Sequence, residues 1–299
     1  MGCRKISVFL LFTLLSQLVF AGSSVFTVSK GKNKIIIGGT IHLLRPTDFP
    51  LPKEFEHAFA NTRMVLFESD LSVAASPEFA QRLARQMRLK NGKTVDQFLQ
   101  PKLWSKLTAY SDKHGFPLHS MKSFNAAFIS IMMTVYEAQR IGASGGVEAH
   151  FSKNMEGKLV GELEDEEEVV QVMRSLARVD ANSVMSSTIR DLENLSETMD
   201  MVVDAWRKGR TEKLYKRLGA DMREENPAVY NTLVVQRNKR WLPKIESLFN
   251  TPETEFILVG AMHLAGPDSL LKMLKNNGYK VRKYRAFLSS PQQNEPAKS

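Results

Sequence analysis

Two matching phrases lie near opposite ends of this chain, and each follows a run of apolar residues. Residues 35–42 read IIIGGTIH and residues 256–263 read FILVGAMH, so both predict a buried strand followed by Gly-x-x-His. Local structure does not explain the match, because the phrases are more than 200 residues apart. If both strands belong to one sheet, their imidazoles lie over the same sheet edge. Two converging histidines are the minimum for a metal site, or for a general base with a partner.

A third apolar run ends in acid. Residues 64–67 read MVLF and are followed by Glu68. In open α/β sheets, ligands bind in the crevice beyond the carboxyl ends of the strands. A carboxylate there can ligate a divalent ion, orient an imidazole or activate water. The residues alone therefore indicate a shared site of His42, Glu68 and His263. The alternative is two hydrogen-bonded structural histidines and a surface glutamate.

The order of the predicted elements indicates the fold class. Strands cluster at the two ends of the chain, and helical patterns fill the middle. We predict an α/β fold with a mixed central sheet built from N- and C-terminal strands. A large helical insertion spans about 77–250 within a single domain at 22–286. The apolar segment 123–140 is expected to be a buried core helix of this insertion.

The first 21 residues are typical of a secretory signal peptide. Arg4 and Lys5 precede a mostly apolar run, and small or apolar residues lead up to Ala21. We therefore expect an exported protein, periplasmic or secreted, with no stable membrane span after cleavage. The single cysteine, Cys3, lies in this segment, so the mature chain lacks thiol nucleophiles, disulfides and cysteine-ligated zinc. The polar tail 287–299 is predicted to be disordered.

Charge and motifs exclude several function classes. The formal net charge is +9, and it is +7 without Arg4 and Lys5, but the basic residues are dispersed. Nucleic acid is therefore not an expected partner. There is no His-Glu-x-x-His pair, Walker loop or Gly-x-Ser-x-Gly elbow, and the residues around Gly38 lack a dinucleotide fingerprint. Of the remaining histidines, His57 is predicted at the surface, and His114 and His119 are predicted to be structural.

The chain resembles the TraB/GumN/Tiki family, and more distantly the erythromycin esterase and ChaN-like proteins. The last matching stretch, which contains His263, is the most specific. The stretches keep the family's order across nearly all of the mature chain: residues 37–44, 65–70, 146–151 and 163–165, Trp206 with Gly209, Arg237-Asn238 with Trp241, and residues 259–268.

This resemblance implies which residues form the active centre. They are His42, Glu68 and His263, with Arg237 facing the same site, where it can stabilise an oxyanion or position a carboxylate. Tiki-like members are described as metal-dependent proteases, the esterase relatives use a histidine base without a metal, and ChaN-like relatives bind haem. The resemblance thus specifies the site better than the reaction.

The chain departs from the family pattern at several positions. Glu148 stands where the family usually has Asp, and Asp165 stands where it has Thr. Lys122-Ser123-Phe124 replaces a Lys-Pro-Trp-like segment. These changes affect the expected shape of the substrate cleft. Glu148, His150 and Glu164 are further candidates for the site, with helix packing and capping as the alternative.

The leading hypothesis is an exported, metal-dependent hydrolase acting on peptide bonds in a peptide or protein substrate. His42, Glu68 and His263 would hold a divalent ion such as Mn, Co or Zn, and Arg237 would neutralise developing charge. The first alternative is a metal-free hydrolase with His42 as general base, oriented by Glu68. The second is a non-catalytic binder of a peptide signal or haem. The sequence does not indicate the oligomeric state.

Overall fold

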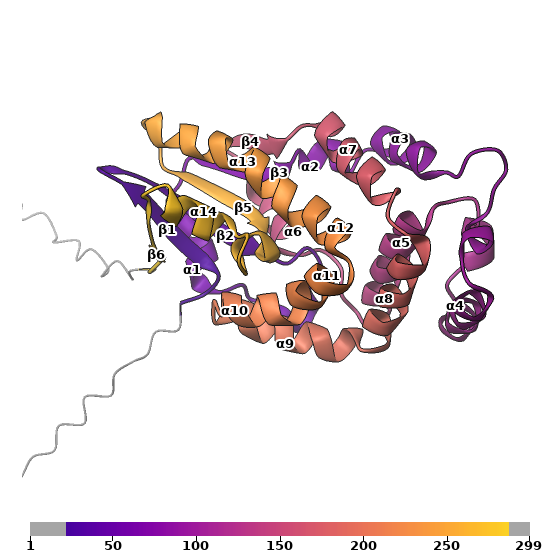
Figure 1. Ribbon diagram of the computed structural model, residues 1–299. Helices are drawn as coiled ribbons and strands as arrows, with labels where there is room; N and C mark the ends of the chain where they lie inside the picture. Colours follow the sequence, from indigo (N-terminus) through magenta and orange to yellow (C-terminus); the bar gives the residue numbers. More distant parts are fainter. Residues whose placement is uncertain (1–21, 287–299) are drawn as a thin grey trace, which may run out of the picture.

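A six-stranded mixed sheet is the centre of the computed structural model, which describes residues 22–286 (Figure 1). The strand order is β4-β3-β5-β2-β1-β6. The strands span Val25–Lys30 (β1), Asn33–Thr40 (β2), Met64–Ser69 (β3), Leu159–Glu164 (β4), Glu255–Gly260 (β5) and Lys280–Lys283 (β6).

Four neighbouring strands of this sheet run parallel. β5 lies between β2 and β3 and pairs with both in parallel, and β4 pairs in parallel with β3. β1 is antiparallel to β2 and to β6. Because parallel strands end at the same sheet edge, the residues that follow β2, β3, β4 and β5 gather there. In the register of β2 and β5, Thr40 lies opposite Gly260, so the two Gly-x-x-His phrases are neighbours.

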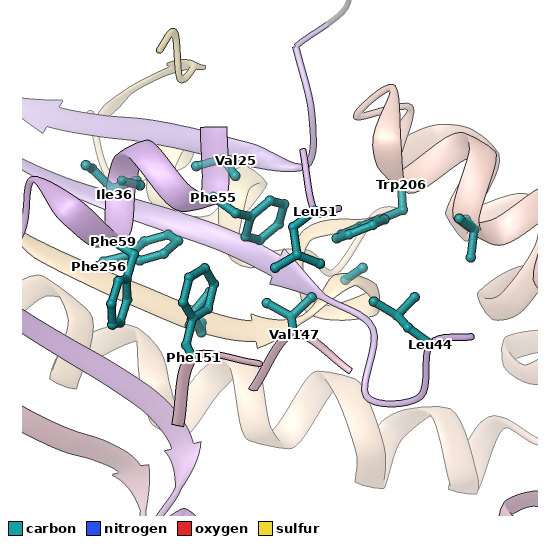
Figure 2. Packing of buried hydrophobic residues seen from close by; sticks show 14 of the residues in the cluster. Val25, Ile36, Leu44, Leu51, Phe55, Phe59, Val147, Phe151, Trp206 and Phe256 are labelled. Atoms are coloured by element: carbon teal, nitrogen blue, oxygen red, sulfur yellow. The ribbon is translucent and has the colours of Figure 1, made fainter. Parts of the chain in front are cut away.

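Each face of the sheet has its own apolar core. Phe55 of α1 (Lys53–Ala60), Phe151 of α6 (Val147–Phe151) and Trp206 of α9 (Leu195–Arg207) pack on one face, against Phe256 and its neighbours (Figure 2). The other face is covered by Trp241 of α13 (Gln236–Ser247) and by α14 (Leu270–Asn276). The buried runs on β2 and β5 follow from this arrangement, because a strand covered on both faces is apolar at successive positions.

The helical middle of the chain builds a separate core beside the sheet (Figure 1). The predicted core helix at 123–140 is α5, and it packs chiefly on α8. The α-helices are Lys53–Ala60 (α1), Leu71–Ala74 (α2), Pro77–Met87 (α3), Pro101–His114 (α4), Ala126–Arg140 (α5), Val147–Phe151 (α6), Glu166–Leu176 (α7), Ala181–Glu193 (α8), Leu195–Arg207 (α9), Thr211–Leu214 (α10), Ala220–Glu225 (α11), Pro227–Tyr230 (α12), Gln236–Ser247 (α13) and Leu270–Asn276 (α14).

Two π-helical segments interrupt the later helices. Tyr215–Gly219 separates α10 from α11, and Asn231–Val235 separates α12 from α13. The sequence pattern predicts one helix from Pro227 to about Phe249. The structure instead has a short α-helix, a π turn, α13 and a final 3-10 turn over that stretch. π turns are rare and occur often at functional sites.

The predicted α/β fold with a helical insertion is confirmed. One feature extends it: β4 comes from the middle of the chain and forms one edge of the sheet, so the sheet is not built from terminal segments alone. Among residues 22–286, no helix has both the length and the apolar character needed to cross a bilayer. The predicted signal peptide at 1–21 and the predicted disordered tail at 287–299 lie outside the described residues.

Candidate active site at the carboxyl edge of the sheet

Gly260, the last residue of β5, is the point on which the candidate residues converge. A methyl group in place of its hydrogen would lie 3.2 Å from Glu68 Oε1, 3.4 Å from His42 Nε2 and 3.7 Å from His263 Cδ2. These groups come from the ends of three parallel strands, β3, β2 and β5. The site therefore follows from the sheet topology.

Glu68 is the central carboxylate of this group. Its Oε1 accepts a hydrogen bond from the backbone N–H of Gly260 at 2.6 Å and lies 3.6 Å from His263 Nε2. Its Oε2 accepts from Arg237 Nη2 at 2.7 Å. Burial alone would raise the pKa of Glu68, but the charge of Arg237, aided by the nearby histidines, lowers it to about 2. Glu68 is therefore a fixed negative charge at neutral pH.

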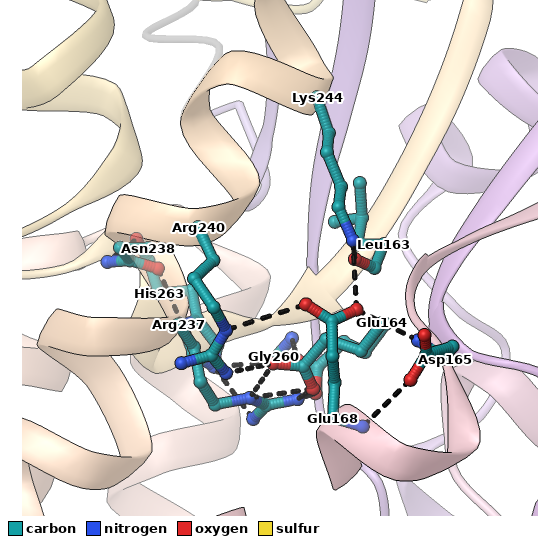
Figure 3. Close-up of polar contacts among 11 residues, drawn as sticks. Leu163, Glu164, Asp165, Glu168, Arg237, Asn238, Arg240, Lys244, Gly260 and His263 are labelled. Atoms are coloured by element: carbon teal, nitrogen blue, oxygen red, sulfur yellow. Dashed lines mark hydrogen bonds and ion pairs between the residues drawn. The ribbon is translucent and has the colours of Figure 1, made fainter.

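His263 is buried and held from both sides of its ring. Its Nδ1 lies 2.7 Å from Asn238 Oδ1, and its Nε2 lies 3.3 Å from Arg237 Nη1 (Figure 3). The ring also packs against Trp241, with centroids 4.3 Å apart. Burial lowers the pKa of His263 to about 3 and outweighs the opposing effect of Glu68, so the imidazole is neutral.

His42 has a different environment. Its side chain is 62% exposed, and its Nδ1 lies 3.0 Å from Glu148 Oε1. The hydroxyl of Thr40 donates to the same oxygen. Desolvation by its neighbours favours neutral His42, but the Glu148 carboxylate, aided by Glu68, outweighs it and raises the pKa of His42 to about 9. Since the ring is more than half exposed, the contact with Glu148 decides the direction of this shift.

Arg237 connects Glu68 to a second buried carboxylate. Its guanidinium donates to Glu164 from Nε at 3.0 Å and from Nη2 at 2.8 Å, as well as to Glu68 (Figure 3). Glu164, at the end of β4, also accepts from Arg240 Nη2 at 2.8 Å. The site thus has a permanent cation that is fixed by carboxylates from two strands.

The structure brings the side chains of His42, Glu68, His263 and Arg237 together. Two of the three further candidates also lie in the group: Glu148 contacts His42, and Glu164 contacts Arg237. The third, His150, instead pairs with Glu56 at 2.8 Å. His57, predicted at the surface, is half-buried and contacts Tyr284. His114 contacts Glu137 and His119 packs on Trp104, away from the site.

Sequence reasoning assigned no role to Asn238 or Gly260. Asn238 is fully buried on α13, one position after Arg237, so the Arg-Asn pair is the only signal that could have indicated it. Gly260 stood in the repeated phrase, but only the structure shows that the donors lie over its α-carbon.

The donor set fits a divalent metal ion in its chemistry. Each histidine has Nδ1 engaged by an oxygen acceptor and leaves Nε2 for the site, which is the usual arrangement of metal-ligating histidines. Two ligands about 2.1 Å from one ion lie roughly 3–3.5 Å apart, close to the 3.6 Å between Glu68 Oε1 and His263 Nε2. In this structure the Arg237 guanidinium lies beside the same His263 nitrogen, 3.3 Å away. Within residues 22–286, no three His, Cys, Asp or Glu side chains are already arranged around one ion position.

Searches for similarity to curated proteins and to solved structures returned no match. A comparison with family models matched the TraB/PrgY/gumN family over residues 24–283, which is most of the chain. The matched region includes every residue of the site, and the chain belongs to the TraB/PrgY/gumN family.

Proposed function

We propose that this protein is a divalent-metal-dependent hydrolase that cleaves peptide bonds. The observation that carries the proposal is the matched orientation of the two histidines. His42 and His263 both engage an acceptor through Nδ1, on Glu148 and Asn238 respectively. The Nε2 of His42 therefore lies beside the space over Gly260 with the Glu68 carboxylate, and the Nε2 of His263 lies 3.6 Å from Glu68 Oε1.

The proposed ion would be held by His42, Glu68 and His263. When bound, such an ion polarises the scissile carbonyl and lowers the pKa of its water to about 7. Glu68 suits this role because it is ionised and its Oε1 is oriented by the Gly260 N–H. Arg237 keeps its charge at every relevant pH and is anchored by Glu164, so it can stabilise negative charge that develops on the substrate oxygen.

The substrate class rests on family resemblance and on access. Tiki-like relatives are described as proteases, and a peptide or protein substrate is the class that follows from this. The exposed face of His42 supports access to the site from solvent. The predicted signal peptide supports action outside the cytoplasm, in the periplasm or beyond it.

A second candidate function is a metal-free hydrolase, and a specific contact favours it. Arg237 already lies 3.3 Å from His263 Nε2 and 2.7 Å from Glu68, so a cation is present without an ion. In this alternative, His42 would have to accept a proton. Its raised pKa opposes both functions, because an imidazole with a pKa of about 9 is mostly protonated at neutral pH and must lose that proton before it can act as a base or ligate an ion.

One experiment separates these functions. The purified protein is stripped of metal and tested on a peptide library with Mn, Co or Zn, and with a chelator. His263→Ala is compared with His119→Ala, a matched change in the helical part of the chain. Cleavage that needs metal, and that only His263→Ala abolishes, is the expected result. Cleavage that survives the chelator favours the metal-free hydrolase. If the protein binds none of these metals and cleaves no peptide, both hydrolase functions are overturned, and a non-catalytic binder of a peptide signal or haem remains.

A further inference from the structure

The side-chain amide of Asn238 has only one workable orientation. Asn238 is fully buried, and its Nδ2 lies 2.8 Å from the backbone oxygen of Asp268 and 3.4 Å from that of His263. Backbone carbonyls accept hydrogen bonds and never donate, so the NH₂ group must face them. The amide oxygen is then directed at His263 Nδ1, 2.7 Å away.

This orientation determines which ring nitrogen of His263 carries the hydrogen. An amide oxygen is only an acceptor, so Nδ1 must be the donor. On the opposite side of the ring, Nε2 lies 3.3 Å from Arg237 Nη1, and a guanidinium is only a donor. Two partners of opposite character therefore require the same tautomer, with hydrogen on Nδ1 and a lone pair on Nε2.

The position of the ring is fixed by the same turn of α13. Arg237, Asn238 and Trp241 lie within five residues of each other and contact Nε2, Nδ1 and the ring face of His263. The π turn Asn231–Val235 immediately precedes them. An i→i+5 turn shifts the face that the following helix presents, which is one way to direct consecutive residues at a single ring.

We infer that Asn238 is a positioning residue, which holds His263 in the Nδ1–H tautomer so that the Nε2 lone pair faces the site. This inference rests on the proposed function for its purpose, because an ion or a proton is taken up at Nε2. The two histidines are thus held by different means. His42 is held by the Glu148 carboxylate at an exposed position, and His263 by a neutral amide in the interior.

The direct test is nitrogen NMR of the histidine rings in the metal-free protein. The His263 signals are assigned by their loss in His263→Gln. The expected spectrum shows His263 protonated at Nδ1 and unprotonated at Nε2. A spectrum with hydrogen on Nε2, or on both nitrogens at neutral pH, would overturn the inference. This measurement needs neither bound metal nor activity, so it stands even if the proposed function fails.

A variant of residue 238 provides the second test. Asn238→Leu removes the acceptor and the NH₂ donor and keeps the branched heavy-atom skeleton of the side chain. Asn231→Leu makes the same change at an exposed position on the preceding π turn. We expect Asn238→Leu to lose the Nδ1–H signature and to weaken Mn²⁺ binding by about 10- to 100-fold. Asn231→Leu should match the wild type in both measurements. A wild-type ring spectrum and affinity in Asn238→Leu would contradict the inference. If Asn238→Leu does not fold, the wild-type spectrum decides alone.

Discussion

Gly39 and Gly260 hold the same place in the two Gly-x-x-His phrases, but the space at their α-carbons is used differently. A methyl group on Gly39 would lie 3.1 Å from the α-carbon of Ala261 and 3.1 Å from Leu264, so this glycine lets the second phrase pack closely. A methyl group on Gly260 would lie among Glu68, His42 and His263. At the residue scale, one glycine serves packing and the other leaves the site open.

The space over Gly260 gives the first prediction. Gly260→Ala should fold, because Gly260 has φ −50° and ψ 136°, a conformation open to alanine. The added methyl would occupy the point where the donors converge. We expect turnover to fall by about 100-fold, with the free energy of unfolding changed by less than about 1 kcal/mol. Gly161→Ala, on edge strand β4, is the control. A Gly260→Ala protein with full activity would contradict the placement of the site.

The second prediction concerns pH. Metal binding needs a neutral imidazole, and His42, with a pKa of about 9, carries a proton below that pH. The apparent Mn²⁺ affinity should therefore rise by about tenfold per pH unit up to about pH 9 and level off above it. Glu148→Gln removes the charge that raises the pKa, so the plateau should begin at lower pH. Calorimetric titrations across this range measure both effects. An affinity that does not change with pH would show that His42 is not a ligand.

The residues that bear the chemistry were predictable to different degrees. His42, Glu68 and His263 each follow an apolar run, and the ends of parallel strands must meet at one edge. Asn238 lies in the first turn of α13, where nothing in the sequence spacing separates an amide that orients a histidine from one that faces solvent. Its role depends on contacts that exist only in the folded chain.

At the scale of elements, the loop after β5 is shaped by close packing against the first π segment. Gly266 has a φ of +78°, and a methyl group on it would collide with the ring of Tyr215. Gly219 ends that π segment, and a methyl group on it would collide with the side chain of Met262. The loop that carries His263 is therefore set against Tyr215–Gly219 by two glycines.

This packing gives the third prediction, with a matched control in the same chain. Gly278 has a φ of +86° and open space around it, whereas Gly266 combines a similar φ with the Tyr215 contact. Gly278→Ala should cost about 1 kcal/mol of unfolding free energy from backbone strain alone. Gly266→Ala should cost roughly 2–4 kcal/mol because steric overlap adds to that strain. Chemical denaturation measures both. Equal costs would show that the Tyr215 contact does not constrain the loop.

The elements themselves show where prediction from sequence stops. Apolar runs indicated β2, β3, β5 and α5 close to their observed positions. The π segments were not predicted, because Asn231–Val235 contains no Gly or Pro or other signal that separates a π turn from a turn of α-helix. The extra residue of a π turn is stabilised by tertiary packing, and the apolar periodicity of a helix does not reveal that packing.

At the scale of the whole molecule, Glu164 ties the edge of the sheet to the helix that covers it. This buried carboxylate at the end of β4 accepts hydrogen bonds from Arg237 and Arg240 of α13. Nearby, Lys244 of the same helix donates to the backbone oxygen of Leu163. The strand from the middle of the chain is thus joined to the C-terminal half by charge as well as by apolar contact.

The fourth prediction follows from this connection. Glu164→Gln leaves two guanidinium groups without their shared carboxylate, and loss of one partner from a buried ion pair costs about 3 kcal/mol of unfolding free energy. Glu162→Gln, an exposed change on the same strand, should alter stability by less than about 0.5 kcal/mol. Thermal unfolding of both variants is the measurement. If the two variants are equally stable, the network does not hold the edge strand in place.

The global arrangement was partly accessible from the sequence. Strands at both ends, with helices between them, predicted the α/β sheet and its insertion. Glu164 was only a further candidate for the site. The sequence did not establish that a strand from the middle of the chain would carry it there. In β4 the apolar run is interrupted by Gly161, Glu162 and Glu164, so the usual sequence signal of a buried strand is weak there.

The most direct test of the central claim is the stoichiometry of Mn²⁺ binding, measured by electron paramagnetic resonance on the metal-stripped protein. We expect one ion per chain, with affinity reduced by at least about 100-fold in His263→Ala and unchanged in His119→Ala. Binding that survives His263→Ala, or no binding at millimolar Mn²⁺, would contradict a metal site formed by His42, Glu68 and His263.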